Sequence, residues 1–109
     1  MLKKLKESDL YLPIKLFLNK QGYEVKGEIK QCDIVAKKDD EIIIIELKLT
    51  LNITLLLQSI DRFTLADIVY IAIPKQTPMY KTKSKQIKKL VARLGLGLIV
   101  VDIQEKQQY

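Results

Sequence analysis

Histidine is absent from the 109 residues of this chain, and cysteine occurs once, at Cys32. Without histidine, Ser-His-Asp and Cys-His catalysis, His-ligated zinc sites and nucleases with a histidine base are excluded. A single cysteine excludes an internal disulfide and indicates a protein that is not exported. What remains for hydrolytic chemistry is a set of carboxylates and lysines acting with a hard cation.

Long apolar runs and glycine-rich phosphate-binding loops are also missing. No apolar stretch approaches the roughly 18 residues that a membrane helix needs. The segment Met1–Glu7 is charged where a signal peptide would be apolar. Neither a P-loop nor a GxGxxG occurs, and Gly95-Leu96-Gly97 is interpreted as a turn. We therefore expect a cytoplasmic protein that makes no contact with a membrane.

Composition and length indicate one globular domain over residues 1–109, with 48% hydrophobic and 29% charged residues. The net charge of +6 is placed unevenly. Residues 1–67 hold 11 acidic and 11 basic side chains, whereas residues 68–109 hold 2 acidic and 8 basic ones. This asymmetry favours a polyanionic partner, and a solvated lysine-rich face explains it equally well.

Hydrophobic periodicity predicts three helices and five strands. The expected helices are Ser8–Lys20, Asn52–Leu65 and Thr82–Leu94, and the expected strands are Tyr23–Lys30, Cys32–Lys37, Glu41–Leu49, Asp67–Pro74 and Leu98–Ile103. The order α-β-β-β-α-β-α-β predicts an α/β fold, a three-layer sandwich with helices on both faces of a mixed central sheet. Pro13 leaves open whether the first helix starts near Leu10 or bends there.

Each predicted helix carries an apolar face that we expect to pack on the sheet. In the first helix this face comprises Leu10, Tyr11, Ile14, Phe17 and Leu18. In the second helix, after Asn52 as N-cap, it comprises Ile53, Leu56, Leu57, Ile60 and Phe63. In the third helix it comprises Ile87, Leu90, Val91 and Leu94, opposite the basic residues Lys81, Lys85, Lys88 and Lys89. These four lysines are candidates for contacting nucleic-acid phosphates, and the alternative is an ordinary solvated face.

Glu46 interrupts the most apolar strand of the chain, Ile42–Leu49, and Lys48 shares its face at a period of two. A charge on a buried strand is costly unless it is paired or bound to a metal ion. If the preceding hairpin turns at Asp39-Asp40, opposed residues have numbers that sum to 79, and Asp33 lies opposite Glu46. Two carboxylates so placed either share a proton or hold a cation.

A purely structural interpretation stands beside this one. In it, Lys48 neutralises Glu46, and Asp33 only occupies the end of a strand. A lone Glu-x-Lys in a strand means little. An opposed Asp, a Glu and a Lys on the same face form a more specific combination, and it favours a functional site.

The same residues carry a family resemblance. Cys32-Asp33, twelve intervening residues and then Glu46-Leu47-Lys48 resemble the (P)D…(D/E)XK signature of the restriction-endonuclease-like superfamily, with Cys32 in place of the optional proline. The predicted element order also resembles its common core, over nearly the whole chain. Segments 7–13, 21–36 and 66–74 look closer still to a bacterial family named as predicted PD-(D/E)XK phosphodiesterases.

The resemblance implies roles for individual residues. Asp33, Glu46 and the backbone carbonyl of Leu47 would bind Mg²⁺ or Mn²⁺, and Lys48 would orient the attacking water and stabilise the transition state. The expected reaction is hydrolysis of a phosphodiester that leaves a 5′-phosphate. These oxygen ligands suit a hard cation, which lowers the pKa of water and neutralises developing charge.

Four further positions match more loosely. Gln58 resembles a catalytic glutamine of related nucleases, and Arg62, four residues later on the same helix face, would lie near the scissile phosphate. A solvent-facing Gln58 and a surface pair between Asp61 and Arg62 explain these two residues equally well. Glu7, just before the first helix, and Glu28, on the strand beside that of Asp33, are second-tier candidates for metal ligands.

We therefore expect a metal-dependent nuclease that acts on DNA in preference to RNA. We expect it to form a homodimer, because one small core offers a narrow platform for a duplex. A non-catalytic nucleic-acid-binding module of the same fold is the alternative. A protein-interaction subunit whose lysines only increase solubility is a third class.

Overall fold

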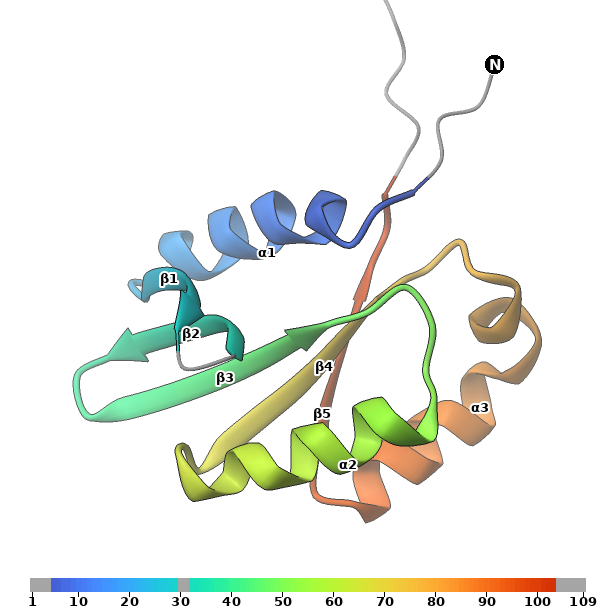
Figure 1. Cartoon of the computed structure of the whole chain (residues 1–109). Coiled ribbons are helices and arrows are strands. Elements are labelled where there is room, and N and C mark those ends of the chain that lie inside the picture. The colour runs from blue at the N-terminus through green and yellow to red at the C-terminus, as the bar shows by residue number, and fades with distance from the viewer. Residues whose placement is uncertain (1–4, 30–31, 104–109) are drawn as a thin grey trace, which may run out of the picture.

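The computed structural model describes residues 5–29 and 32–103, with the backbone alone for Glu28, Ile29 and Cys32. In this part the elements are α1 (Ser8–Lys20), β1 (Glu24–Ile29), β2 (Cys32–Lys38), β3 (Glu41–Leu47), α2 (Ile53–Asp61), the short 3-10 helix η1 (Arg62–Thr64), β4 (Ile68–Pro74), α3 (Pro78–Arg93) and β5 (Gly97–Val101). The predicted order of helices and strands is confirmed (Figure 1).

The strands form one mixed sheet in the order β1-β2-β3-β4-β5. β1, β2 and β3 are antiparallel neighbours, whereas β3 pairs with β4, and β4 with β5, in parallel. Parallel neighbours need a crossover connection, and α2 and α3 supply the two crossovers. The carboxyl ends of β3, β4 and β5 therefore lie along the same edge of the sheet.

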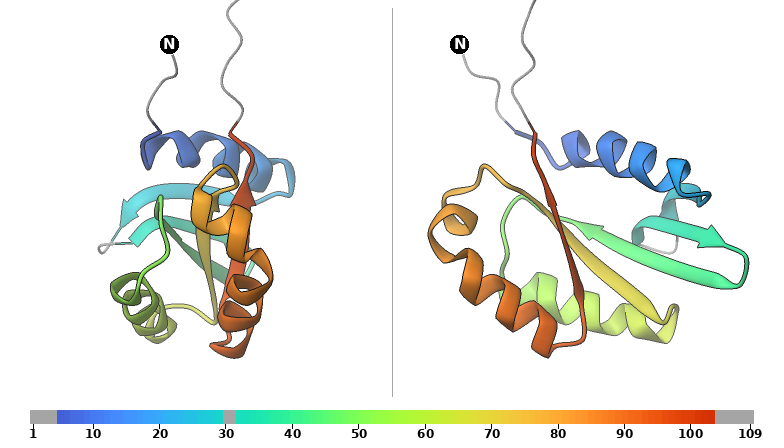
Figure 2. Two further views of the ribbon diagram at one scale, coloured as in Figure 1. Left: turned by 90° about the vertical axis from the view of Figure 1, so that its right-hand side faces the viewer. Right: turned by 180° about the vertical axis from the view of Figure 1, so that it is seen from behind.

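Helices cover both faces of this sheet (Figure 2). On one face, α1 contributes Leu10, Ile14 and Leu18 to a core cluster that includes Ile45 of β3. On the other face, α2 and α3 pack in a second cluster that contains Ile44. Consecutive residues of β3 are thus buried on opposite sides, which explains why this strand is apolar at nearly every position.

Local signals account for the ends of the first two helices. Gly22 has φ +91°, the left-handed conformation expected after the end of α1. The side chain of Asn52 accepts a hydrogen bond of 2.9 Å from the backbone N–H of Leu55 and caps α2 as predicted. α1 begins at Ser8 and continues through Pro13, which lacks the N–H that would bond to the carbonyl of Asp9.

The predicted apolar face of α2 is confirmed for Leu56 and Phe63, which pack against the core, and is wrong for Ile53, Leu57 and Ile60. Ile53 is 73% exposed and Leu57 is 59% exposed, whereas Leu55 and Ser59 are fully buried against the sheet. Residues 55, 59 and 62 follow one another at helical spacing, so the line that faces the sheet ends at Arg62. The side of α2 that carries Ser59, with Arg62 after it, therefore faces the sheet, and the side that carries Ile53 and Leu57 faces outward.

Smaller corrections concern the other two helices and the edge of the sheet. Phe17 of α1 and Leu90 of α3, both expected to be inward, are exposed. α3 starts at Pro78, four residues earlier than predicted, because Thr77 caps it. At Gly97 of β5, an added Cβ would lie 2.3 Å from the ring of Tyr70, so only glycine fits there. None of the helices within the described residues combines the length and apolarity needed to cross a membrane.

Candidate active site

The register of β2 against β3 places Asp33 next to Glu46. Lys38 pairs with Glu41 across the Asp39-Asp40 turn, and the pairing continues to Ile34 opposite Ile45. Asp39 has φ +54°, as a tight two-residue hairpin turn requires. The predicted register is confirmed, and its next position joins Asp33 and Glu46.

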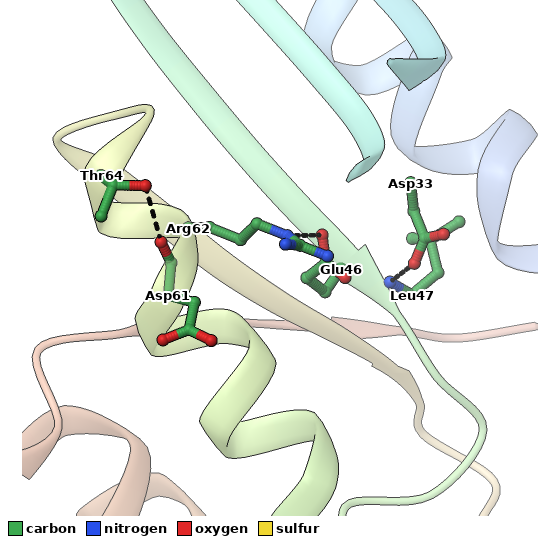
Figure 3. A network of polar contacts seen from close by, with 6 residues as sticks. All are labelled: Asp33, Glu46, Leu47, Asp61, Arg62 and Thr64. Carbon is green, nitrogen blue, oxygen red and sulfur yellow. Dashed lines mark hydrogen bonds and ion pairs between the residues drawn. The ribbon is translucent and has the colours of Figure 1, made fainter. Parts of the chain in front are cut away.

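Glu46 is a buried carboxylate with an arginine as its partner. It is 3% exposed and lies on the α2 side of the sheet, two residues after Ile44. The Nε–H of Arg62 donates a hydrogen bond to Oε2 of Glu46, with 3.2 Å between the two heavy atoms (Figure 3). Arg62 follows α2 directly, so the rotation of that helix delivers this counter-charge.

The pKa of Glu46 reflects these opposing influences. Burial raises it above its ordinary value, and the negative charge of Asp33 raises it further. Arg62 lowers the pKa of Glu46 through its hydrogen bond and its charge, and a backbone hydrogen bond at Asp33 lowers it slightly. The net direction is upward, so the arginine does not fully compensate for burial and for the neighbouring carboxylate.

Asp33 makes a different contact. Its Oδ2 accepts a hydrogen bond of 2.8 Å from the backbone N–H of Leu47 (Figure 3). The N–H of Lys48, one residue later, donates to the carbonyl of Ala72 in β4, so the N–H of Leu47 is turned toward β2. The carboxylate of Asp33 thus bonds the backbone of β3 at the end of the β2–β3 ladder.

The environment of Lys48 differs from the expected one. β3 ends at Leu47, so the alternation that would put Lys48 on the face of Glu46 no longer applies. Its Nζ lies 3.7 Å from Oε2 of Glu7, and the two side chains are 38% and 47% exposed. The interpretation in which Lys48 neutralises Glu46 is wrong, because Arg62 holds that place and Lys48 pairs with Glu7.

A pocket of about 540 Å³ lies beside Asp33. Among the described residues, its walls are formed by Glu7, Ser8, Tyr11, Gly27, Asp33 and Leu47. The pocket brings Glu7, a second-tier candidate, to the same cavity as Asp33. The prediction that Asp33 and Glu46 converge on one cavity is corrected here, since Glu46 is directed to Arg62 and is not among the walls.

Sequence reasoning missed three of these walls, Ser8, Tyr11 and Gly27. Of the two interpretations of Arg62, the surface pair with Asp61 is wrong, because Arg62 pairs with the buried Glu46; its place near a scissile phosphate stays a prediction. A signal for this pair exists in the sequence. Arg62 is the only basic residue between positions 49 and 74, and a buried glutamate requires a counter-charge.

For two of the candidate residues, Gln58 and Glu28, the described part of the structure places no side chain in the site. Gln58 lies on the exposed surface of α2, next to the buried Ser59. The side chain of Glu28 lies outside the described residues. Among the described side chains, no group of three or more His, Cys, Asp or Glu residues is placed to hold a metal ion.

The chemistry of the donors nevertheless fits Mg²⁺ or Mn²⁺. Asp33 and Glu46 supply carboxylate oxygens, and in an extended strand the carbonyl of Leu47 points to the same side as its N–H, toward β2. Two obstacles are visible. The guanidinium of Arg62 engages Glu46, and Oδ2 of Asp33 engages a backbone N–H. A cation would have to replace at least the first of these contacts.

The candidate nucleic-acid residues lie on α3. Lys81, Lys85, Lys88 and Lys89 are exposed, and the ammonium of Lys88 lies 6.0 Å from the ring centre of Tyr80. α3 starts after the carboxyl end of β4, so Lys81 lies at the edge of the sheet that also carries the end of β3. Lys88 lies further along α3, beyond a kink at Lys83.

Comparisons with known protein families, with curated proteins and with solved structures find no match for this chain.

Proposed function

We propose that this chain is a magnesium-dependent nuclease with a restriction-endonuclease-like fold. The observation that carries the proposal is the pair of carboxylates, Asp33 and Glu46, at neighbouring positions of two antiparallel strands. The charge of Asp33 raises the pKa of the buried Glu46, so the two groups interact. Carboxylate oxygens at neighbouring positions are ligands that a hard divalent cation prefers.

The element order supports the fold assignment. A helix, an antiparallel β1-β2-β3 meander, a crossover helix and a parallel β4 occur in this sequence, as the resemblance to the superfamily predicts. The resemblance rests on this order and on Asp33, Glu46 and Lys48.

In the proposed reaction, Asp33, Glu46 and the carbonyl of Leu47 would hold a Mg²⁺ ion. When bound, the ion would supply a water of lowered pKa and neutralise charge on the phosphate. Lys48 orients the attacking water and donates hydrogen bonds to the developing negative charge. Glu7 positions the ammonium of Lys48 through their 3.7 Å ion pair at the mouth of the pocket. The product is a 5′-phosphate.

The proposed substrate is nucleic acid, DNA in preference to RNA. The excess positive charge of residues 68–109 supports a polyanionic partner. The lysines of α3 would contact phosphates, with Lys81 nearest to the edge that carries the site. A second copy of the chain would widen the platform for a duplex.

A cleavage panel tests the proposal. Single-stranded, duplex and branched DNA and an RNA are incubated with the protein and Mg²⁺ or Mn²⁺, and with a chelator. We expect metal-dependent cleavage that is lost in Asp33→Asn and Glu46→Gln. Asp67→Asn, which removes an exposed carboxylate elsewhere, is the matched control and should cleave as the wild type does. Equal cleavage by all four proteins would reveal a contaminant and remove the support for the proposal.

One observation favours the alternative, a non-catalytic nucleic-acid-binding module. Glu46 and Lys48 already have partners within the protein, Arg62 and Glu7. Such a module would bind DNA in chelator as well as in Mg²⁺, and Glu46→Gln would leave binding unchanged. The same panel, read by gel shift, separates the two functions.

A further inference from the structure

We infer that Arg62 is an internal counter-ion of Glu46 that a divalent cation must displace, and that the displaced guanidinium becomes available to a phosphate of the substrate. This inference rests on the proposed function. One ion pair would thus regulate metal binding and, once it is broken, supply a contact with the substrate. Arg62 acts here as a positioning residue until it is released.

The ion pair engages one of the two oxygens through which the Glu46 carboxylate would bind a metal ion. The Nε–H of Arg62 donates to Oε2 of Glu46 at 3.2 Å, and their side chains are 16% and 4% exposed. Because water does not reach the buried carboxylate of Glu46, the carboxylate depends on the positive charge of Arg62 for stabilisation. A cation at the same carboxylate would lie close to the guanidinium, and the two positive charges would repel each other.

Arginine cannot resolve this conflict by losing its proton, because its guanidinium stays charged in proteins. A lysine in a buried position has that option. Arg62 therefore has to move when a cation binds to Glu46. Arg62 belongs to η1, the short helix that follows α2, and Glu46 belongs to β3, so the two partners of the pair lie on different elements.

The displaced side chain suits one class of ligand. A guanidinium carries a planar set of donors that matches the oxygens of a phosphate and binds them in pairs. Arg62 would remain within a side-chain length of Glu46, which is where the scissile phosphate would lie under the proposed function. Metal and substrate would then assist each other, because each favours the conformation in which Arg62 has left Glu46.

The second ion pair of the site does not compete in this way. The Nζ of Lys48 and Oε2 of Glu7 lie 3.7 Å apart and the two side chains are 38% and 47% exposed, so water screens both charges. Breaking this pair would change the affinity for a cation at Glu46 only slightly. Arg62 is thus the residue whose removal should change metal binding most.

The first experiment measures metal binding without nucleic acid and without turnover. Wild type, Arg62→Gln and Arg62→Lys are titrated with Mg²⁺ and Mn²⁺ by calorimetry. We expect Arg62→Gln to bind the cation about 5-fold more tightly or better, because a competing charge is gone. Arg62→Lys keeps the charge and should lie between the two. Arg93→Gln, which removes the exposed arginine of α3, is the matched control and should bind the cation as the wild type does.

Arg62→Gln leaves a buried glutamate without its partner, so a second measurement uses the wild type alone. The chain has two arginines, Arg62 and the exposed Arg93, so the side-chain Nε–H region of an NMR spectrum holds two signals. We expect Mg²⁺ to shift the Arg62 signal and speed its exchange with water. Arg93 should not change. The backbone N–H of Leu47 should report metal binding independently.

The outcomes separate the inference from the proposed function. If no cation binds to the wild type or to Arg62→Gln, the metal site and the proposed function both fail. If the cation binds and shifts the Leu47 signal while the Arg62 signal stays in place, the nuclease proposal survives and the inference is overturned. Equal or weaker metal binding by a folded Arg62→Gln would overturn it in the same way.

Discussion

Two ion pairs lie at the ends of β2 and β3, and they differ in how much water reaches them. Glu46 and Arg62 are buried between the sheet and the segment after α2, whereas Glu7, which lines a pocket beside α1, and Lys48 are partly exposed. Both pairs join candidate site residues. Two similar ion pairs in one site can therefore contribute unequally to the free energy of unfolding.

The difference follows from desolvation. In the exposed pair, each charge keeps most of its hydration, and such pairs contribute about 0–1 kcal/mol. In the buried pair, removing Arg62 leaves the carboxylate of Glu46 buried without its counter-charge. The buried pair therefore holds structure in place, while the exposed pair can rearrange freely during a reaction.

The largest effect is expected from Arg62→Ala. It leaves Glu46 buried and unpaired, and we expect the free energy of unfolding to fall by about 3 kcal/mol at neutral pH. Urea denaturation of the variant and of the wild type measures this. The deficit should shrink in mild acid, because Glu46 then accepts a proton. A loss below about 1 kcal/mol would show that the buried and exposed pairs are alike.

Glu46→Gln should behave differently from Arg62→Ala, although both break the same pair. It removes the charge whose burial is unfavourable and retains an oxygen that accepts the Arg62 hydrogen bond. We expect the metal-free fold to be slightly more stable or unchanged at pH 7. Under the proposed function, the wild type melts higher with millimolar Mg²⁺ and the variant loses this shift, together with cleavage.

The pH dependence of that variant follows from the pKa of Glu46. Because the folded-state pKa is raised, the folded wild type binds a proton at a higher pH than the unfolded chain does. The wild type therefore gains stability relative to Glu46→Gln as the pH falls from neutral, through the folded pKa, to the ordinary glutamate range. Urea denaturation of both proteins at pH 7 and pH 5 checks the sign. A relative loss for the wild type would mean that Arg62 dominates and lowers the pKa of Glu46.

Lys48→Ala should have a small effect on stability, within about 1 kcal/mol, because its pair with Glu7 is exposed. Under the proposed function the same variant loses cleavage and keeps most of its nucleic-acid binding. Thermal denaturation, gel shift and cleavage are measured on one preparation. Unfolding of the purified variant would instead identify Lys48 as a structural counter-charge.

The smallest effects are expected on α3, where Lys81, Lys85 and Lys88 are exposed. Replacing all three with Gln should leave the free energy of unfolding almost unchanged. If they contact DNA phosphates, each lost contact should flatten the log–log dependence of affinity on salt by roughly 0.9. An unchanged slope would show that this face is only solvated, and it would remove one support for a nucleic-acid partner.

Much of the fold follows from local rules. The turn at Asp39-Asp40 and the alternation on either side of it predict the β2–β3 register, which the structure confirms. Asn52 and Gly22 mark a helix start and a helix end because their side-chain oxygen or lack of a Cβ acts on the nearest backbone. These effects act over a few residues, so the sequence alone is enough to predict the turn and the helix ends.

The rotation of α2 could not be obtained in this way. Its most apolar side, with Ile53 and Leu57, indicates burial, yet the helix packs through Leu55 and Ser59. Hydrophobic periodicity compares residues within one helix and takes no account of the side chains on the sheet that the helix packs against. Here the sheet presents a buried carboxylate, and the observed rotation brings Arg62 to it.

The sequence by itself determined the order of the elements, the hairpin register and hence the neighbouring positions of Asp33 and Glu46. Only the tertiary structure decided that Arg62 pairs with Glu46, that Lys48 pairs with Glu7, and that Asp33 turns to the N–H of Leu47. The physical reason is the range of the interactions. Turns and strand alternation act between near neighbours, whereas the partner of a charge depends on which elements the packed fold brings within about 4 Å.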